Sequence, residues 1–285
     1  MPPMKMVKRR LTSVTTTKKI MKAMKMVAAS KLQKDKTRLE SARPFFDEAR
    51  KTIDILRSRE DTMENIFLKP REVKNTAYLV ITSDRGLCGS FNINLLEKAM
   101  SHMSKGRNEK IIVIGLKGYD YFRRHNKNIL HKYDGVLETA FYEDAERIAQ
   151  FIADLYTFGK IDEVYVAYTQ FKSVLTHIPR VEKILPLVND PVDADSAGDM
   201  NYEPDISSYL DQAVFVYLSA FIYTALLESS SCEQAARMFS MDTAVNNASD
   251  ILTKLTRIFN RRRQAAITQE ISEIVNSTNI SKVKR

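Results

Sequence analysis

Residues 83–92, which read SDRGLCGSFN, hold the densest set of side chains that could do chemistry. The stretch follows an apolar run and precedes a helix-like one, which is where phosphate-binding loops lie in α/β proteins. It lacks the lysine of G-x-x-x-x-G-K-S/T and the spacing of G-x-G-x-x-G. Glycine adopts positive φ at little cost, so Gly86 and Gly89 favour a tight strand-to-helix turn over a nucleotide-binding loop.

The same turn holds a candidate nucleophile, Cys88. No histidine lies near it in the sequence. The four histidines fit neither a catalytic triad nor a metal site; they stand at 102, 125, 131 and 177. A small buried thiol is therefore the favoured interpretation of Cys88. We expect the neighbouring Asp84 and Arg85 to pair with each other as a local salt bridge.

Two further charged clusters are candidates for ligand binding. The acidic run 189–205 lacks the spacing of a calcium loop and predicts a solvated loop. Three consecutive arginines, 261–263, would spread over about 200° of a helix, so they cannot all face one phosphate. They fit a collar that meets partners on several sides. We expect no catalytic residue, no cofactor and no metal site in this chain.

The net charge of +9 is unevenly distributed. Residues 1–38 hold twelve Lys and Arg and one acid, and residues 251–285 hold eight and two. Residues 184–211 hold seven acids and no Lys or Arg. Basic ends on an otherwise balanced chain predict a shared polyanionic partner. Nucleic acid, an anionic membrane surface and an acidic protein surface all remain open at this point.

Cysteine usage and hydropathy bear on the compartment. Cys88 and Cys232 cannot build a disulfide framework, which favours a reducing, cytoplasmic compartment. The N-terminal stretch lacks the apolar core of a signal peptide. The longest apolar run, 213–228, falls short of the roughly 18 residues of a membrane span, so we expect a buried amphipathic helix there.

Long helices are predicted at both ends of the chain. Residues 4–58 contain one proline, Pro44, and no glycine, and residues 207–276 contain neither. Apolar residues recur in both at spacings of three and four. Neither helix can bury its apolar stripe alone, so we expect the two to pair as an antiparallel coiled coil. Pro44 should bend the first helix rather than end it.

Residues 18–31, KKIMKAMKMVAASK, combine lysine with methionine. On a helical wheel Lys18, Lys22 and Lys25 share one arc, which we interpret as a basic face for successive acidic loops of a partner. Ile20 and Val27 fall in an apolar arc that we expect to be buried in the coiled coil.

The middle of the chain predicts a Rossmann-like α/β domain. Apolar runs at 75–84, 110–115 and 163–171 read as strands and alternate with helical segments, which is typical of a mostly parallel sheet. A run at 174–187 reads as an edge strand, because Pro179 limits its pairing. The predicted organisation has three parts: coiled-coil helices at 1–60 and 207–280, and the inserted domain at 73–192.

Four stretches carry a resemblance to a known family. They are SVTTTKKIMKAMKMVAASKL (13–32), VITSDRGLCGSFN (80–92), SSCEQAARMFSMDTAVNNA (230–248) and FNRRRQAAITQEISEIV (259–275). In this order and spacing they closely resemble the bacterial type of gamma subunit of F-type ATP synthases, over essentially the whole chain. The resemblance implies a rotor without an active site, whose coiled coil carries torque from the membrane c ring to the catalytic head.

The same resemblance implies partners and a location. The expected partners are the alpha, beta and epsilon subunits, the delta subunit through the head, and the c ring, with no nucleic acid. The chain is expected at the cytoplasmic face of the bacterial plasma membrane, held there only through the complex. It would couple ion translocation to ATP synthesis or hydrolysis.

Contact residues follow from the matching motifs. Met24 corresponds to a position beside the acidic lever loop of a beta subunit, and Arg237 to one that meets a beta catch loop. The resemblance places three more residues in that contact zone with the head: Gln264, Thr268 and Glu270. Tyr202 and Glu203 would face the c ring or the epsilon subunit.

Two other classes compete with the rotor. A basic coiled-coil nucleic-acid binder predicts tight, steeply salt-dependent DNA binding by the isolated chain. A small-molecule enzyme predicts nucleotide binding by the α/β domain.

Overall fold

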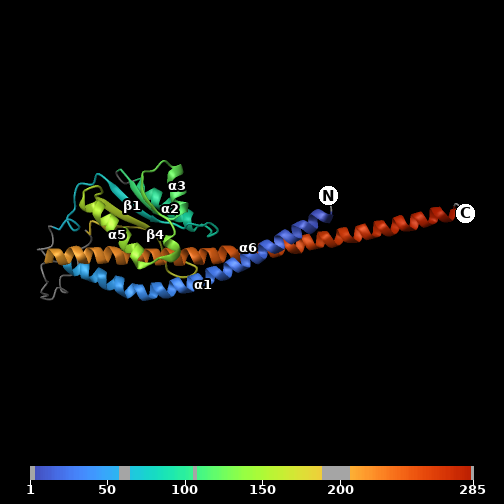
Figure 1. Ribbon diagram of the computed structural model, residues 1–285, viewed down its shortest axis with the longest axis horizontal. Helices are drawn as coiled ribbons and strands as arrows, with labels where there is room; N and C mark the ends of the chain where they lie inside the picture. The colour runs from blue at the N-terminus through green and yellow to red at the C-terminus, as the bar shows by residue number, and fades with distance from the viewer. Residues whose placement is uncertain (1–3, 58–64, 105–107, 188–205, 284–285) are drawn as a thin grey trace. The chain divides into compact units, whose positions relative to one another are not determined.

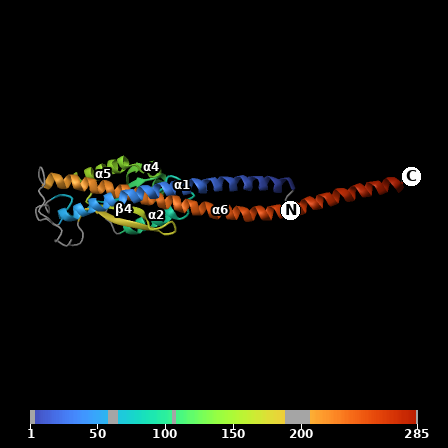
Figure 2. The same cartoon turned by 90° about the horizontal axis from the view of Figure 1, so that it is seen from below.

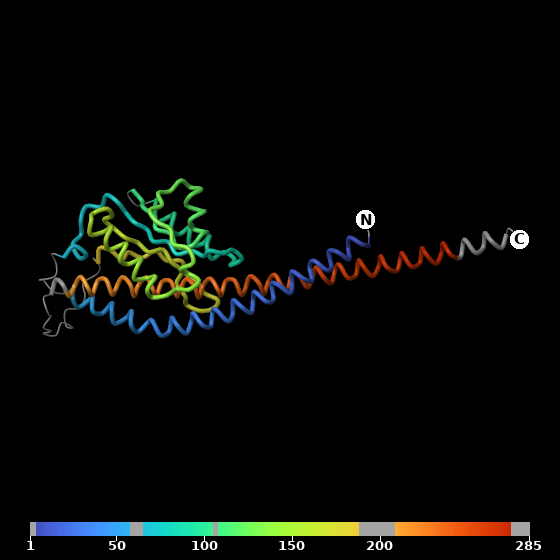
Figure 3. Tube along the Cα trace, viewed as in Figure 1, coloured from blue at the N-terminus to red at the C-terminus, as the bar shows by residue number. Residues whose placement is uncertain are grey.

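The computed structural model describes residues 4–57, 65–104, 108–187 and 206–283, and the side chains of 206–208 and 275–283 are not described. Two of the predicted contact residues, Tyr202 and Glu203, lie outside the described residues. The chain divides into two compact units, one of Ala28–Arg237 and one of Met1–Val27 with Met238–Arg285. Figure 3 follows the chain from the first long helix through the α/β region and back along the last helix.

The larger unit is built on a five-stranded sheet. Its strands are β1 (Thr76–Ile81), β2 (Lys110–Ile114), β3 (Ile129–Tyr133), β4 (Glu163–Phe171) and β5 (His177–Leu185), in the order β3-β2-β1-β4-β5. The first four strands are parallel to one another, and β5 pairs antiparallel with β4. Their near-continuous apolar sequence fits strands covered on both faces. The predicted α/β sheet is confirmed, with the Pro179 strand at its edge as expected.

Helices cover both faces of this sheet (Figure 1). α2 (Phe91–Met103) and α3 (Leu116–Arg124) connect β1 to β2 and β2 to β3, and bury Leu95, Met103 and Phe122 against Tyr78 and Val113. The chain then reverses direction across the sheet through α4 (Val136–Thr139) and α5 (Tyr142–Thr157). Because crossovers are right-handed, this reversal places α5 on the opposite face. Figure 2 shows α5 beside the last long helix.

The two long helices are α1 (Met4–Arg57) and α6 (Ile206–Val283). α1 continues through Pro44, as predicted. In the larger unit Ser230 of α6 donates to Asp35 of α1 at 2.7 Å. In the smaller unit Lys25 of α1 lies 2.6 Å from the Asp242 carboxylate of α6. In the larger unit, residues 35, 43 and 46 of α1 contact residues 230, 228 and 221 of α6, so the two helices run antiparallel there. This confirms the predicted helix pair.

Burial along α1 follows a heptad pattern, with inward positions alternately three and four residues apart. The inward heptad positions up to residue 39, all buried or half-buried, are Val7, Leu11, Val14, Lys18, Met21, Lys25, Ala28, Leu32, Asp35 and Leu39; Met24, Ala29 and Arg38, which flank them, are also half-buried. The prediction that Ile20 and Val27 are buried is wrong: they are 55% and 58% exposed. The heptad phase turns Lys18 and Lys25 inward instead and leaves these two apolar side chains on the flank.

In the smaller unit the burial of α6 shows the same spacing. Its inward positions are Met241, Val245, Ala248, Leu252, Leu255, Phe259, Arg262 and Ala266. Among the described residues, α6 is also the one helix that is long and apolar enough to cross a membrane, with a best window of mean hydropathy 1.6. That window is 56% buried inside the protein, and a helix in a protein core meets the same criterion.

Candidate partner-contact surfaces

The glycine turn after β1 is filled by its own side chains. The Asp84 carboxylate accepts hydrogen bonds from the backbone N–H of Leu116 (3.1 Å) and of Gly135 (3.2 Å), so it joins the loops that follow β2 and β3. Arg85 pairs with Glu138 at 3.1 Å, so the expected Asp84–Arg85 pair is wrong. Asp84 therefore holds neighbouring loops together at the carboxyl edge of the sheet, while Arg85 points outward with 76% of its side chain exposed.

Neither cysteine is suited to nucleophilic chemistry. Cys88 and Cys232 are both buried, and burial raises the pKa of each thiol. A raised pKa leaves little thiolate at neutral pH, and the thiolate is the reactive form. Within the described part of the chain, no three His, Cys, Asp or Glu side chains lie close enough to hold a metal ion.

Arg237, a predicted partner contact, is held by its own chain. Its guanidinium pairs with Glu233 and donates to the side chain of Gln234 (3.1 Å) and the carbonyl of Gly86 (3.4 Å). Burial raises the pKa of Glu233, and the adjacent Arg237 opposes that shift. Only 11% of the Arg237 side chain is exposed. It therefore anchors the glycine turn on α6.

The sequence analysis missed one exposed side chain in the glycine turn that Arg237 holds. Leu87, in the glycine turn, is 63% exposed and has a φ of 64°. A bulky residue with positive φ is strained and persists only where its surroundings hold it. The motif indicated a tight turn, but it did not indicate that a leucine would stand outward at its tip.

The predicted basic face of α1 divides into two kinds of side chain. Lys22 is exposed, whereas Lys18 and Met24 are half-buried. Lys25 pairs with Asp242 across the helix pair, with 40% and 44% of the two side chains exposed. The helix therefore does not present a single arc of exposed lysines, because Lys18 and Lys25 occupy inward heptad positions.

The contact residues predicted near the end of α6 are all exposed. Thr268 donates its hydroxyl to the backbone carbonyl of Gln264 at 2.9 Å, and Glu270 lies on the next turn. Between and beyond them Ile267 and Ile271 are 48% and 56% exposed. This part of the helix presents mixed polar and apolar side chains in the described chain.

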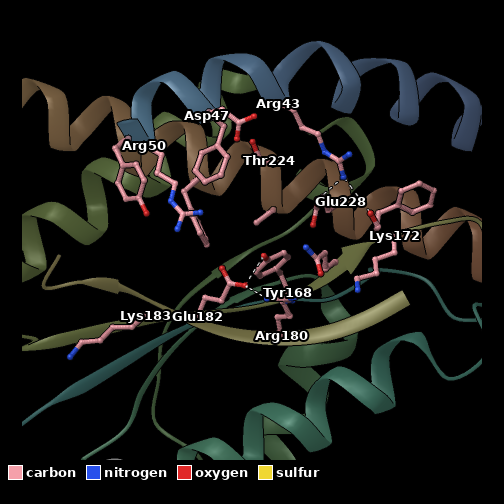
Figure 4. A pocket seen from close by; sticks show the side chains of 16 residues that line it. Arg43, Asp47, Arg50, Tyr168, Lys172, Arg180, Glu182, Lys183, Thr224 and Glu228 are labelled. Atoms are coloured by element: carbon pink, nitrogen blue, oxygen red, sulfur yellow. Dashed lines mark hydrogen bonds and ion pairs between the residues drawn. The ribbon is translucent and has the colours of Figure 1, made fainter. Parts of the chain in front are cut away.

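A pocket of about 910 Å³ in the larger unit lies between α1, α6 and the β4–β5 pair (Figure 4). Four of its charged side chains pair with one another: Arg43 with Glu228 (3.1 Å), and Arg180 with Glu182 (3.2 Å). The Tyr168 hydroxyl also donates to Glu182 at 3.2 Å. Its wall includes rings of Phe46, Tyr168, Tyr217 and Phe221. No single stretch of sequence predicts this pocket, because its lining comes from four separate segments.

The fold defines an α/β protein whose two long terminal helices pair and carry an inserted domain with a five-stranded sheet. A family model described as ATP synthase matches residues 3–279. The ATP synthase gamma chain of Alkaliphilus metalliredigens is 39% identical over 95% of this chain and 96% of its own length. That of Desulforamulus reducens is 40% identical over 94% and 95%.

A solved structure of an ATP synthase is similar to this chain as well. The central stalk and c-ring structure of the Tetrahymena thermophila mitochondrial ATP synthase contains a chain that is 25% identical, with a TM-score of 0.63. The match covers 79% of this chain and 99% of that one. The chain belongs to the ATP synthase gamma-chain family, as the four sequence motifs predicted.

Proposed function

We propose that this chain is the central-stalk rotor of an F-type ATP synthase. It transmits torque from the membrane c ring to a head of alpha and beta subunits, and so couples ion translocation to ATP synthesis or hydrolysis. The observation that carries the proposal is the antiparallel pairing of α1 with α6, in a chain whose relatives are gamma chains. Two helices that brace each other resist bending and twisting better than one.

The chain acts without an active site of its own. Two features support this: the thiols are buried with raised pKa values, and the polar side chains of the glycine turn are occupied in joining loops. Catalysis is assigned to the nucleotide sites of the head. The chain works at the cytoplasmic face of the bacterial plasma membrane, and the complex alone holds it there.

The contact residues receive the following roles. Lys18, Lys22 and Met24 of α1 meet acidic loops of successive beta subunits, together with Lys25 as it exchanges Asp242 for each loop. Arg237 presents the glycine turn to the head. The contact zone near the end of α6 consists of Gln264, Thr268 and Glu270, while Tyr202 and Glu203 face the c ring or the epsilon subunit.

The test is assembly and coupling. The tagged chain, expressed in its own cells, should capture alpha, beta and epsilon subunits in a complex that hydrolyses ATP. Replacing Lys18, Lys22 and Lys25 with Ala should reduce ATP-driven ion pumping per ATP hydrolysed, by about half or more, and leave the captured subunits unchanged. Capture of nucleic acid without these subunits, or unchanged pumping in the triple variant, would contradict the proposal.

A further inference from the structure

One stretch of α6 is polar in sequence and fully enclosed in the fold. Residues 228–234 read ESSSCEQ, and none of them is more than 6% exposed. Buried polar groups lower the stability of a fold unless they are hydrogen-bonded. Six of the seven side chains have a hydrogen-bond or ion-pair partner, and the Ser231 hydroxyl has none. The partners of the six therefore show what the stretch does.

On one side the stretch is bonded to the sheet. Ser229 accepts a hydrogen bond from the backbone N–H of Thr169 in β4 at 3.2 Å. One turn further along the helix, the Cys232 thiol lies 3.5 Å from the carbonyl oxygen of the same Thr169. A single strand residue is thus held at both its donor and its acceptor by α6.

On the other side the stretch is bonded to α1. Ser230 donates to the Asp35 carboxylate at 2.7 Å, and these two side chains are 2% and 8% exposed. Arg43 donates both to Glu228 (3.1 Å) and to the carbonyl of Phe171 at the end of β4 (3.3 Å). Arg43 therefore links α1, α6 and the sheet, one heptad and one residue beyond Asp35.

Asp35 also breaks an otherwise repetitive heptad pattern. In successive heptads the paired inward positions are Leu32 and Asp35, then Leu39 and Ala42, then Phe46 and Ala49. The position that Asp35 occupies is alanine one heptad before it and in the next two after it. Apolar packing alone would distinguish poorly between this alignment and one displaced by seven residues, or about 10 Å. A single buried polar residue at such a position can fix the alignment of two helices.

We infer that the Asp35–Ser230 hydrogen bond is the register pin of the helix pair, and that the Arg43–Glu228 pair and the Ser229–Thr169 bond fasten it to the sheet. In the displaced alignment the Asp35 carboxylate would be buried without the Ser230 hydroxyl. This deepens the proposed function, on which its consequence for torque rests: a load on one helix passes to the other only if the two do not slide.

The alignment can be measured directly in the isolated full chain. Spin labels at Lys36 of α1 and Gln212 of α6, both exposed, lie in the same unit as the pin. Wild type should give one narrow distance distribution. The double variant Asp35→Leu with Ser230→Ala should add a second population in which the distance changes by up to about 10 Å, the length of one heptad. A single distribution like that of wild type would overturn the inference.

Two further variants serve as controls for the double variant. Asp47→Leu removes an exposed acid of the same helix and should leave the distance distribution single. Asp35→Asn keeps a side chain that can bond Ser230, so it should also keep one population. If the double variant does not fold, Asp35→Asn and Asp35→Ala decide the matter: one population for the first and two for the second support the pin, and equal distributions overturn it.

The consequence for torque is tested separately in the assembled complex. A slipping helix pair should lower ATP-driven ion pumping per ATP at least twofold in the double variant, and Asp47→Leu should not change it. Two distance populations with unchanged pumping would count against the proposed rotor function. One population, whatever the pumping, would overturn the pin and leave the rotor function standing.

Discussion

The helix α6 is buried in two different ways in the two units of the chain. In the unit Ala28–Arg237, nearly every residue from Leu218 to Ala235 is buried, including serines and glutamates. In the unit that contains Met238–Arg285, only every third or fourth residue between Asp250 and Ala266 is half-buried, and the others there are exposed. The first stretch is surrounded by sheet and helix together, whereas the second has a single helix partner. Polar side chains in the first stretch must find partners, and those in the second can remain in water.

This difference predicts how each region responds to change. Where a helix is enclosed on all sides, small alterations should be costly and should act on the fold. Where one seam is enclosed, most alterations should be tolerated by the fold and should act on partners. The following substitutions test that contrast in order of expected effect.

The largest effect is expected at Gly115, at the end of β2. Its φ is 93°, and a Cβ there would lie 2.1 Å from the backbone oxygen of Thr82. Gly115→Ala should therefore destabilise the chain by about 3–5 kcal/mol, since both the backbone and a packed neighbour must move. Gly159→Ala is the control, because it too has a positive φ but no neighbour within 4 Å, and it should cost about 1 kcal/mol. Thermal unfolding of both variants measures the difference; equal losses would show that φ alone governs Gly115.

The second substitution tests the heptad phase of α1. Leu32 is 7% exposed and occupies an inward position, so Leu32→Ala should cost about 2–5 kcal/mol. Ile20 is 55% exposed, so Ile20→Ala should change the free energy of unfolding by less than about 0.5 kcal/mol. Urea unfolding of the two variants compares them. A large loss at Ile20 would restore the apolar-arc interpretation that the structure replaces.

The sequence predicted the elements of this fold well because each has a strong local pattern. Parallel strands buried on both faces read as apolar runs, and helices without glycine or proline read as continuous. It misplaced Ile20 and Val27 because an apolar wheel ranks residues by type, whereas burial is set by the phase of the partner helix. The polar inward positions, Lys18, Lys25 and Asp35, were invisible for the same reason.

The contact surfaces were harder to predict than the fold. Motif likeness drew attention to Arg237, but its role in holding the turn at Gly86 depends on two segments about 150 residues apart. The pocket at Arg43 and Glu228 joins helices and strands in the same way. Such sites depend on tertiary contacts that no single stretch of sequence contains.

The third prediction, of intermediate size, concerns how the stability of the fold depends on pH. Burial raises the pKa of Glu228 above its usual value near 4.5, and the pair with Arg43 offsets part of that shift. A carboxyl group with a raised pKa in the folded state contributes stability below its unfolded pKa, and that contribution is lost as pH rises through the folded pKa. Glu228→Gln cannot ionise, so its stability relative to wild type should rise as the pH increases from 4 to 7. Unfolding curves at several pH values test this, and a pH-independent difference would mean that Arg43 fully compensates the burial of Glu228.

The smallest effect is expected in the unit where one seam is enclosed. Lys25 and Asp242 lie 2.6 Å apart, but 40% and 44% of their side chains are exposed, so water and salt screen the pair. A double-mutant cycle with Lys25→Ala and Asp242→Ala should give a coupling energy of about 0.5 kcal/mol that falls as salt is added. The Arg43–Glu228 pair is the natural comparison, because only 7% of the Glu228 side chain is exposed, and its coupling should be larger and less sensitive to salt. Equal coupling energies and equal salt dependence in the two cycles would contradict the contrast between the units. A weak pair at Lys25 also fits the contact proposed for it, since a lysine that is to exchange Asp242 for acidic loops of the head must release each of them.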